Sequence, residues 1–115
     1  MNRQDATNII KTFPETPGVY FFRAKPAAPK PGVGEILYIG KATSLRDRVK
    51  SYWANDIAVT RGPKIVKMLL EFDAITFEKT DSVLEALLLE SYLIKKYQPE
   101  YNTKEKDNKS FHYVV

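Results

Sequence analysis

The order of apolar and polar positions in the first half of the chain predicts two short strands joined by a loop. Residues 19–22 form a β-prone run after Pro17-Gly18, and residues 35–39 form a second strand that Gly40 closes. The stretch between them, residues 24–34, holds three prolines and two glycines and can be neither helix nor central strand. The pattern therefore indicates an antiparallel hairpin with a long loop at its tip.

Helical spacing of apolar side chains begins after Ser44. The motif Ser44-x-x-Asp47 resembles a capping box in which Asp replaces the usual Glu, and it predicts a helix that runs to about Trp53. Pro63 suits the first turn of a second helix. The apolar stripe of this second helix is formed by Ile65, Met68, Leu69 and Phe72.

The last part of the chain predicts a third strand and the longest helix. Ile75 and Phe77 alternate with polar residues in a short strand. Ser82-x-x-Glu85 is a capping box for a helix over about residues 82–97, which Pro99 must end. A polar tail follows and becomes β-prone at residues 111–115. Together these elements predict an α+β fold, a small and mostly antiparallel three-stranded sheet flanked by helices.

Length and composition limit the class of protein. A chain of 115 residues has room for one small core, so residues 1–115 are predicted to form a single domain. The absence of cysteine excludes disulfides and thiolate metal sites. The sequence has neither a signal peptide nor a stretch that could span a membrane, so a cytoplasmic protein is expected.

The net charge of +4 is concentrated in one segment. Residues 41–67 hold seven basic and two acidic side chains, so this segment is +5 and the rest of the chain is −1. A local excess of this kind attracts a phosphate backbone, although a solvated helical face has the same composition. The basic residues, and hence the candidate DNA contacts, are Lys41, Arg46, Arg48, Lys50, Arg61, Lys64 and Lys67.

One acid interrupts the apolar side of the longest helix. At about 100° per residue, Glu90 falls in the middle of the side formed by Val83, Ala86, Leu87, Leu93, Ile94 and Tyr97. An uncompensated carboxylate is costly in such a place, so Glu90 must be neutral, paired with a cation or bound to a metal. A salt bridge is the commoner arrangement, and a single carboxylate with waters is also how Mg²⁺ is often held beside a phosphate.

Two cations near the first helix are further candidates. Arg48 and Tyr52 are four residues apart and share a face, and Arg48 lies at the edge of the apolar stripe, from which a guanidinium can reach an anion. Lys41 is expected in the strand-to-helix turn, near a helix N-terminus that favours phosphate. Arg48 could instead be a snorkelling arginine whose stem covers apolar surface.

The motifs resemble those of a known family. Gly18-Val19-Tyr20 and Tyr38-Ile39-Gly40 resemble the two-part signature of the GIY-YIG nuclease superfamily, and the whole of residues 13–114 resembles its UvrC-like members in order. The further matching segments are LYIGKA at 37–42, LRDRV at 45–49, EALLLE at 85–90, LIK at 93–95, PEYN at 99–102 and DNKSF at 107–111. The loop at 24–34 is longer and richer in proline than the family turn, which should alter surface contacts rather than chemistry.

The resemblance implies a metal-dependent endonuclease and assigns roles within it. Glu90 matches the single metal-binding glutamate, for one Mg²⁺ or Mn²⁺ ion, and Arg48 matches the catalytic arginine. Gly40 ends the second strand, where a side chain would crowd the site. The full set of implied catalytic residues is Tyr20, Tyr38, Lys41, Arg48, Tyr52, Glu90 and Asn102.

The chemistry of phosphodiester hydrolysis narrows these roles. The only histidine, His112, is near the end of the chain, so the general base is expected to be a tyrosine, either Tyr20 or Tyr38. A phenol has a pKa of about 10 and needs a nearby cation to act at neutral pH. Arg48 would neutralise charge on the phosphate, and Tyr52 would orient the phosphate or the water.

The resemblance also implies a biological task. UvrC-like domains cut damaged duplex DNA on the 3′ side of the lesion, in a complex assembled with other excision-repair subunits such as a UvrB-like loader. Whole UvrC proteins continue into further domains, so the chain is either a piece of such a protein or a stand-alone relative. Two alternatives are a binding module that has lost catalysis and a GIY-YIG nuclease with another task, such as a mobile-element or restriction enzyme.

Overall fold

The computed structural model describes residues 3–26, 34–53 and 62–102 of the chain. Its elements are α1 (Arg3–Ile10), β1 (Gly18–Arg23), β2 (Ile36–Ala42), α2 (Leu45–Lys50), the 3₁₀ turn η1 (Ser51–Trp53), α4 (Pro63–Glu71), β3 (Ala74–Lys79) and α5 (Val83–Tyr97). The three strands form one antiparallel sheet in the order β2-β1-β3. The α+β class expected from the sequence is confirmed.

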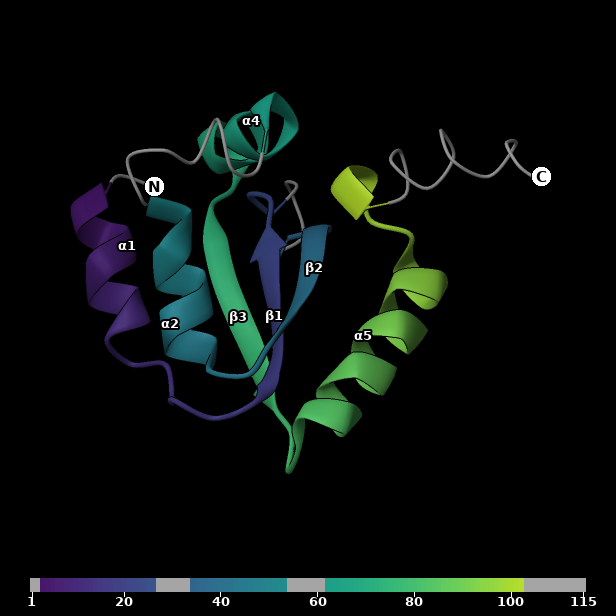
Figure 1. The fold of residues 1–115 in the computed structure, drawn as a ribbon. Coiled ribbons are helices and arrows are strands. Elements are labelled where there is room, and N and C mark those ends of the chain that lie inside the picture. The colour runs from purple at the N-terminus through teal and green to yellow at the C-terminus, as the bar shows by residue number, and fades with distance from the viewer. Residues whose placement is uncertain (1–2, 27–33, 54–61, 103–115) are drawn as a thin grey trace.

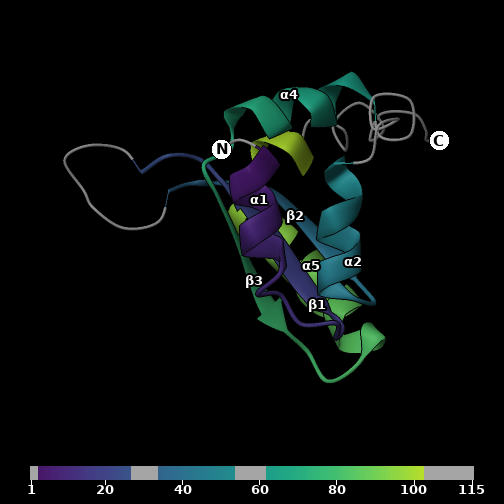
Figure 2. The same cartoon turned by 90° about the vertical axis from the view of Figure 1, so that its left-hand side faces the viewer.

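Helices cover both faces of the sheet (Figure 1). In the turned view, α1 and α2 lie in front of the sheet, α4 crosses above them and α5 lies behind (Figure 2). Because strand side chains alternate between the faces, β1 contributes to two cores. Its Tyr20 and Phe22 pack with Leu45, Val49 and Met68. Its Val19 and Phe21 pack with Ile39, Ala86 and Ile94.

The predicted helix signals are present in the structure. The Ser44 hydroxyl accepts a hydrogen bond from the backbone N–H of Asp47 and caps α2, and Ser82 accepts from Glu85 in the same way at the start of α5. The Glu85 carboxylate in turn accepts from the backbone N–H of Asp81. At its other end α5 stops at Gln98, whose left-handed backbone (φ 43°) comes just before Pro99.

The second strand runs further than its pattern predicts. We expected Gly40 to close it and Lys41 to lie in the following turn, but β2 continues to Ala42 and pairs Lys41 with Val19. The prediction was wrong because β1 supplies partners along its whole length, so pairing with Gly18 and Val19 keeps Lys41 and Ala42 extended. Lys41 therefore projects from a strand and not from a turn.

The helices differ from the prediction in three ways. The first predicted helix ends as α-helix at Lys50, and η1 continues it to Trp53 as a tighter turn. The N-terminal helix α1 was not predicted. On α5 the residues Val83, Leu87 and Tyr97 are exposed and not part of the buried side, because α5 carries apolar residues nearly all round and only its contact with the sheet selects the buried ones.

Some sequence features lie outside the described residues. They are residues 27–33 of the predicted loop, Arg61 and the β-prone segment 111–115. Within the described residues, no helix has the length and apolar character needed to cross a lipid bilayer.

Candidate active site

Three tyrosines from different elements meet on the α2 face of the sheet. Tyr20 of β1 and Tyr52 of η1 are both buried, and their hydroxyl oxygens are 2.6 Å apart in a hydrogen bond. The rings of these two residues make an edge contact with centroids 5.8 Å apart. Tyr38 of β2 is half-buried, and its ring centroid is 6.5 Å from that of Tyr20.

Gly40 makes this cluster possible. It is paired with Tyr20 across the sheet, and a Cβ at this position would lie 2.3 Å from both Cζ and Oη of Tyr20. No other residue fits without moving the tyrosine. The expectation that a side chain at Gly40 would crowd the site is therefore confirmed, although the glycine is inside the strand and not at its end.

Arg48 is the cation of the tyrosine cluster. Burial opposes its charge, but the hydroxyls of Tyr20, Tyr52 and Tyr38 outweigh that effect and raise the pKa of the guanidinium above its ordinary value. The side chain comes from α2 and is exposed on one side. It is thus a permanent positive charge that is held by phenol oxygens and open to an anion.

The protonation of Tyr38 depends on its neighbours. Burial raises the pKa of its phenol above the ordinary value, and the neighbouring Tyr20 and Glu90 raise it further. A hydrogen bond with Tyr52 and the charge of Arg48 act in the opposite direction without cancelling these effects. The bare protein therefore keeps Tyr38 protonated, and additional positive charge is needed to make it a base.

Lys41 and Glu90 lie on the other face of the sheet. The Lys41 Nζ atom is 3.8 Å from Oε1 of Glu90, and the side chains are 49% and 18% exposed respectively. This separation exceeds hydrogen-bonding distance, so Lys41 offsets the charge of Glu90 without occupying its oxygen lone pairs. Glu90 lies one turn from the buried Ala86 and one turn from the buried Ile94, which fixes its direction toward the sheet.

The site therefore wraps around one edge of the sheet. β2 is an edge strand, and its alternation sends Tyr38 toward the α2 side and Lys41 toward the α5 side. Tyr38 and Glu90 are close enough for the Glu90 charge to act on the Tyr38 phenol. A ligand at this edge can meet groups from both faces at once.

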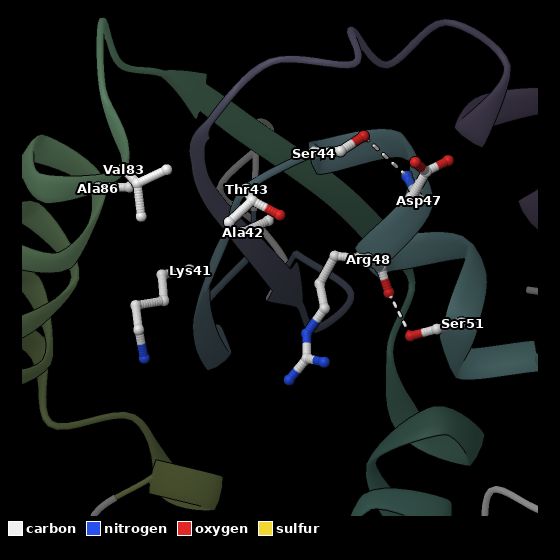
Figure 3. A pocket seen from close by; sticks show the side chains of 9 residues that line it. All are labelled: Lys41, Ala42, Thr43, Ser44, Asp47, Arg48, Ser51, Val83 and Ala86. Atoms are coloured by element: carbon white, nitrogen blue, oxygen red, sulfur yellow. Dashed lines mark hydrogen bonds between the residues drawn. The ribbon is translucent and has the colours of Figure 1, made fainter.

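A groove of about 460 Å³ opens beside this edge. In the close view, Lys41 and Arg48 project from opposite sides and their charged ends point the same way (Figure 3). No site role was predicted for the uncharged polar residues of this lining; the available signal for Thr43 and Ser44 was their position directly after β2. The lining residues are Lys41, Ala42, Thr43, Ser44, Asp47, Arg48, Ser51, Val83 and Ala86.

Asn102 contributes to the site by binding the backbone of β2. Its side-chain oxygen accepts from the N–H of Ile39 (2.9 Å), and its side-chain nitrogen donates to the carbonyl of Ile39 (3.0 Å). Ile39 lies between Tyr38 and Gly40. The amide thus fastens the turn that follows α5 to the strand that carries Tyr38 and Lys41.

The remaining predicted DNA contacts do not converge on the groove. The Nε atom of Arg46 donates to the carbonyl of Phe13 (2.8 Å), and Nη1 is 3.7 Å from a carboxylate oxygen of Glu15. Lys50 lines a separate groove between α1 and α2. Lys64 and Lys67 are on α4, and Arg61 lies outside the described residues.

The side chains at this edge fit one divalent cation. Among the described residues no three His, Cys, Asp or Glu side chains gather in one place, so a closed protein cage is absent there. Glu90 supplies one partly buried carboxylate whose lone pairs are not taken by its lysine partner. One carboxylate completed by waters is an arrangement that Mg²⁺ commonly adopts beside phosphates.

Comparison with known proteins agrees with the fold and the motifs. Residues 16–103 match the family model described as the UvrC-like GIY-YIG domain. The magnesium-bound GIY-YIG N-terminal endonuclease domain of UvrC from Thermotoga maritima has 34% identity and a TM-score of 0.70, over 89% of this chain and 99% of that one. Variants of that domain with a tyrosine changed to phenylalanine, or an asparagine to alanine, also bind the cation and match this chain.

Whole proteins of the same kind are also similar. UvrABC system protein C from Thermoanaerobacter sp. (strain X514) is 41% identical over 105 residues, which are 91% of this chain and 16% of that protein. The protein of the same name from Methanospirillum hungatei JF-1 is 42% identical over 105 residues, which are 91% of this chain and 18% of the relative. The chain thus spans about a sixth of the length of these relatives.

The three-stranded sheet and the tyrosines of the two motifs, Tyr20 and Tyr38, are those of a GIY-YIG nuclease domain. Within that class, the chain belongs to the UvrC-like GIY-YIG domain family.

Proposed function

We propose that this chain is a metal-dependent DNA endonuclease domain that hydrolyses one phosphodiester bond of damaged duplex DNA in nucleotide excision repair. The observation that carries the proposal is that edge strand β2 presents Tyr38 on the face of the tyrosine cluster and Arg48, and Lys41 beside Glu90 on the other face. An acid, a permanent cation and a phenol within reach of one another can serve the three needs of the reaction. These are a metal ligand, a phosphate contact and a base.

Glu90 is the proposed metal ligand, for Mg²⁺ or Mn²⁺. When bound, the cation would act as a Lewis acid on a phosphate oxygen and add the positive charge that this site lacks. Glu90 is fit for this role because α5 fixes its direction and Lys41 leaves its oxygens open. Lys41 is itself free to contact a phosphate oxygen, since about half of its side chain is exposed.

Tyr38 is the better of the two candidate bases. The Tyr20 hydroxyl is buried and bonded to Tyr52, whereas Tyr38 is half-buried at the edge of the sheet. A base must reach a water, and Tyr38 has the more open position. Tyr20 and Tyr52 then act by holding Arg48 and the Tyr38 ring in place.

The wider task is proposed from the relatives. Proteins named UvrABC system protein C share this domain, so the chain would work with damage-recognition and loading subunits of a UvrA and UvrB type. We assign it the incision on the 3′ side of the lesion, in the cytoplasm. Few phosphate contacts are available on so small a domain, which explains why loading by partners would be needed.

A nicking assay with two variants tests the proposal. In the presence of Mn²⁺, the chain should nick lesion-containing duplex when the loading subunits are supplied. Glu90→Gln should abolish nicking while DNA binding persists. It should also abolish Mn²⁺ binding, which is measured by electron paramagnetic resonance. Arg48→Ala should reduce both nicking, by about 10²–10³-fold, and DNA binding.

The matched control is Glu35→Gln, which changes an exposed acid directly before β2 that does not line the active-site groove. It should leave nicking and Mn²⁺ binding unchanged. Nicking by Glu90→Gln at the rate of the unaltered chain would contradict the assignment of the metal ligand. DNA binding without any nicking by the unaltered chain, in Mg²⁺ and in Mn²⁺, would favour the non-catalytic binding module.

A further inference from the structure

The face of α5 that points away from the sheet carries a row of large apolar side chains. Leu84, Leu88 and Tyr92 follow one another at four-residue spacing and are 63%, 61% and 59% exposed. Single exposed apolar residues are ordinary, but a continuous row on one helix face is typical of a contact surface.

A groove lies next to this row. α5 packs on β2 and β1, so the edge strand β3 is left beside the helix and not beneath it. The space between them has a volume of about 500 Å³ and is lined by Glu78, Lys79, Thr80, Asp81, Glu85, Leu88, Leu89 and Tyr92. Leu88 and Tyr92 belong to both the row and the groove. We call the groove together with Leu84 the β3–α5 surface.

The charge of this surface is opposite to that of the active-site groove. Its lining carries the acids Glu78, Asp81 and Glu85 and one cation, Lys79, and the ammonium of Lys96 lies 5.9 Å from the centroid of the Tyr92 ring. A phosphate backbone is repelled by such a rim, so DNA is a poor ligand here. The charges favour a cationic occupant.

A second copy of the chain is also a poor occupant. A two-fold dimer through this surface would place the same three acids against one another, and like charges at an interface are unfavourable. A stable dimer also needs about 800 Å² from each partner. A groove of this size suits a short segment with one or two apolar anchors.

We propose that the β3–α5 surface binds a lysine- or arginine-rich amphipathic segment of a protein partner. Apolar side chains of the segment would sit between Leu88, Leu89 and Tyr92, and its cations would face Glu78, Asp81 and Glu85. None of these six residues lines the active-site groove. The inference therefore does not rest on the proposed nuclease activity.

The position of the β3–α5 surface on the molecule suits a nuclease that a partner must bring to its substrate. Glu90 projects from α5 toward the sheet, and the row of Leu84, Leu88 and Tyr92 projects from the same helix toward solvent. A partner can thus hold the domain from behind while the active-site groove remains open to DNA.

Titration of the full chain with a synthetic peptide tests the proposal by nuclear magnetic resonance. The probe is a lysine peptide with leucine at every third or fourth position. Its twin has glutamate in place of every lysine. The lysine–leucine peptide should cause saturable amide shifts centred on residues 78–81, 85, 88 and 92, and added salt should weaken its binding. The glutamate twin should cause none.

Two variants locate the contact and one controls for it. Leu88→Ser and Glu78→Lys should each weaken peptide binding by about fivefold or more. Leu70→Ser, at a leucine of α4 that is 83% exposed, should leave binding unchanged. Correct folding of each variant is read from the unperturbed amide signals of the sheet.

Three results would overturn the proposal. The first is the absence of saturable shifts, and the second is shifts centred on Lys41 and Arg48. The third is self-association of the chain, measured by sedimentation, that is abolished by Leu88→Ser. That result would assign the surface to a second copy.

Discussion

The hydroxyl of Tyr20 is hydrogen-bonded to the hydroxyl of Tyr52, 32 residues later in the chain, at 2.6 Å inside the protein core. One hydroxyl donates and the other accepts, so each of these two buried polar groups has a hydrogen-bond partner where water cannot reach it. This bond ties the central strand to the turn that follows α2, and Arg48 lies beside both of its partners.

Removal of both partners should cost less stability than the two single removals added together. Tyr52→Phe leaves the buried Tyr20 hydroxyl without this partner, and we expect the free energy of unfolding to fall by about 1–3 kcal/mol. The double variant Tyr20→Phe/Tyr52→Phe should lose less than the sum of the single variants. Urea unfolding of the four proteins measures this, and simple additivity would show that the bond is energetically unimportant.

Gly40→Ala should disrupt the site through sterics alone. The added Cβ would meet Cζ and Oη of Tyr20 at 2.3 Å, so the ring must move away from Tyr52 and Arg48. We expect a loss of about 1–3 kcal/mol in stability, together with a large loss of nicking. A melting curve and the nicking assay measure the two effects, and unchanged values for both would contradict the described packing.

Glu90→Gln should affect chemistry far more than stability. The Lys41–Glu90 pair is separated by 3.8 Å and its lysine is about half exposed, so the pair contributes only about 0–1 kcal/mol. A melting temperature close to that of the unaltered chain is therefore expected, with nicking abolished. A loss of about 3–5 kcal/mol would instead identify a buried structural salt bridge and remove the case for a metal at Glu90.

Asn102→Ala should loosen the edge strand. The amide makes two hydrogen bonds to the backbone of Ile39, and both would be lost. We expect faster hydrogen exchange at the Ile39 amide and reduced nicking, although Asn102 does not line the groove. Asn102→Asp is the informative comparison, because it keeps an acceptor for the Ile39 N–H but loses the donor to its carbonyl. It should not restore activity.

Alkaline pH should unfold the chain through Tyr101. Burial, followed by interactions with Glu71 and Glu100, raises the pKa of this phenol to about 12. A folded pKa above the unfolded value of about 10 means that the neutral phenol favours the folded state. Its contribution is complete below about pH 10 and is lost as the pH rises toward 12. Tyrosinate absorbance and circular dichroism should change together in that window, and Tyr101→Phe should weaken the coupling.

The sequence predicted most of the elements because their local signals are independent of packing. Ser44, Ser82 and Pro99 act on backbone groups only a few residues away, so their effects could be seen in the chain itself. The unusual position of Glu90 could be recognised for a similar reason, since a charge in an apolar stripe is visible without a structure.

Features that depend on neighbours in space could not be predicted in this way. Nothing local shows that β1 keeps Lys41 extended, or that the contact with the sheet buries Ala86 and Ile94 but leaves Leu87 and Val83 exposed. The orientation of Arg46 toward Phe13 and Glu15 is of the same kind. The +5 segment was continuous in sequence, but those of its basic residues that the structure describes are divided among β2, α2 and α4.

The division of the site between the two faces of β2 makes the complete site depend on the packing of α5 against the sheet. Tyr20, Tyr38, Tyr52 and Arg48 belong to the sheet and its α2 side, whereas Glu90 arrives only with α5. A molecule whose α5 has detached would keep its phenols and its arginine and lose its carboxylate. With Glu90 as the proposed metal ligand, such a partly opened molecule would not cut DNA, and the competent nuclease would be restricted to chains in which both cores are closed.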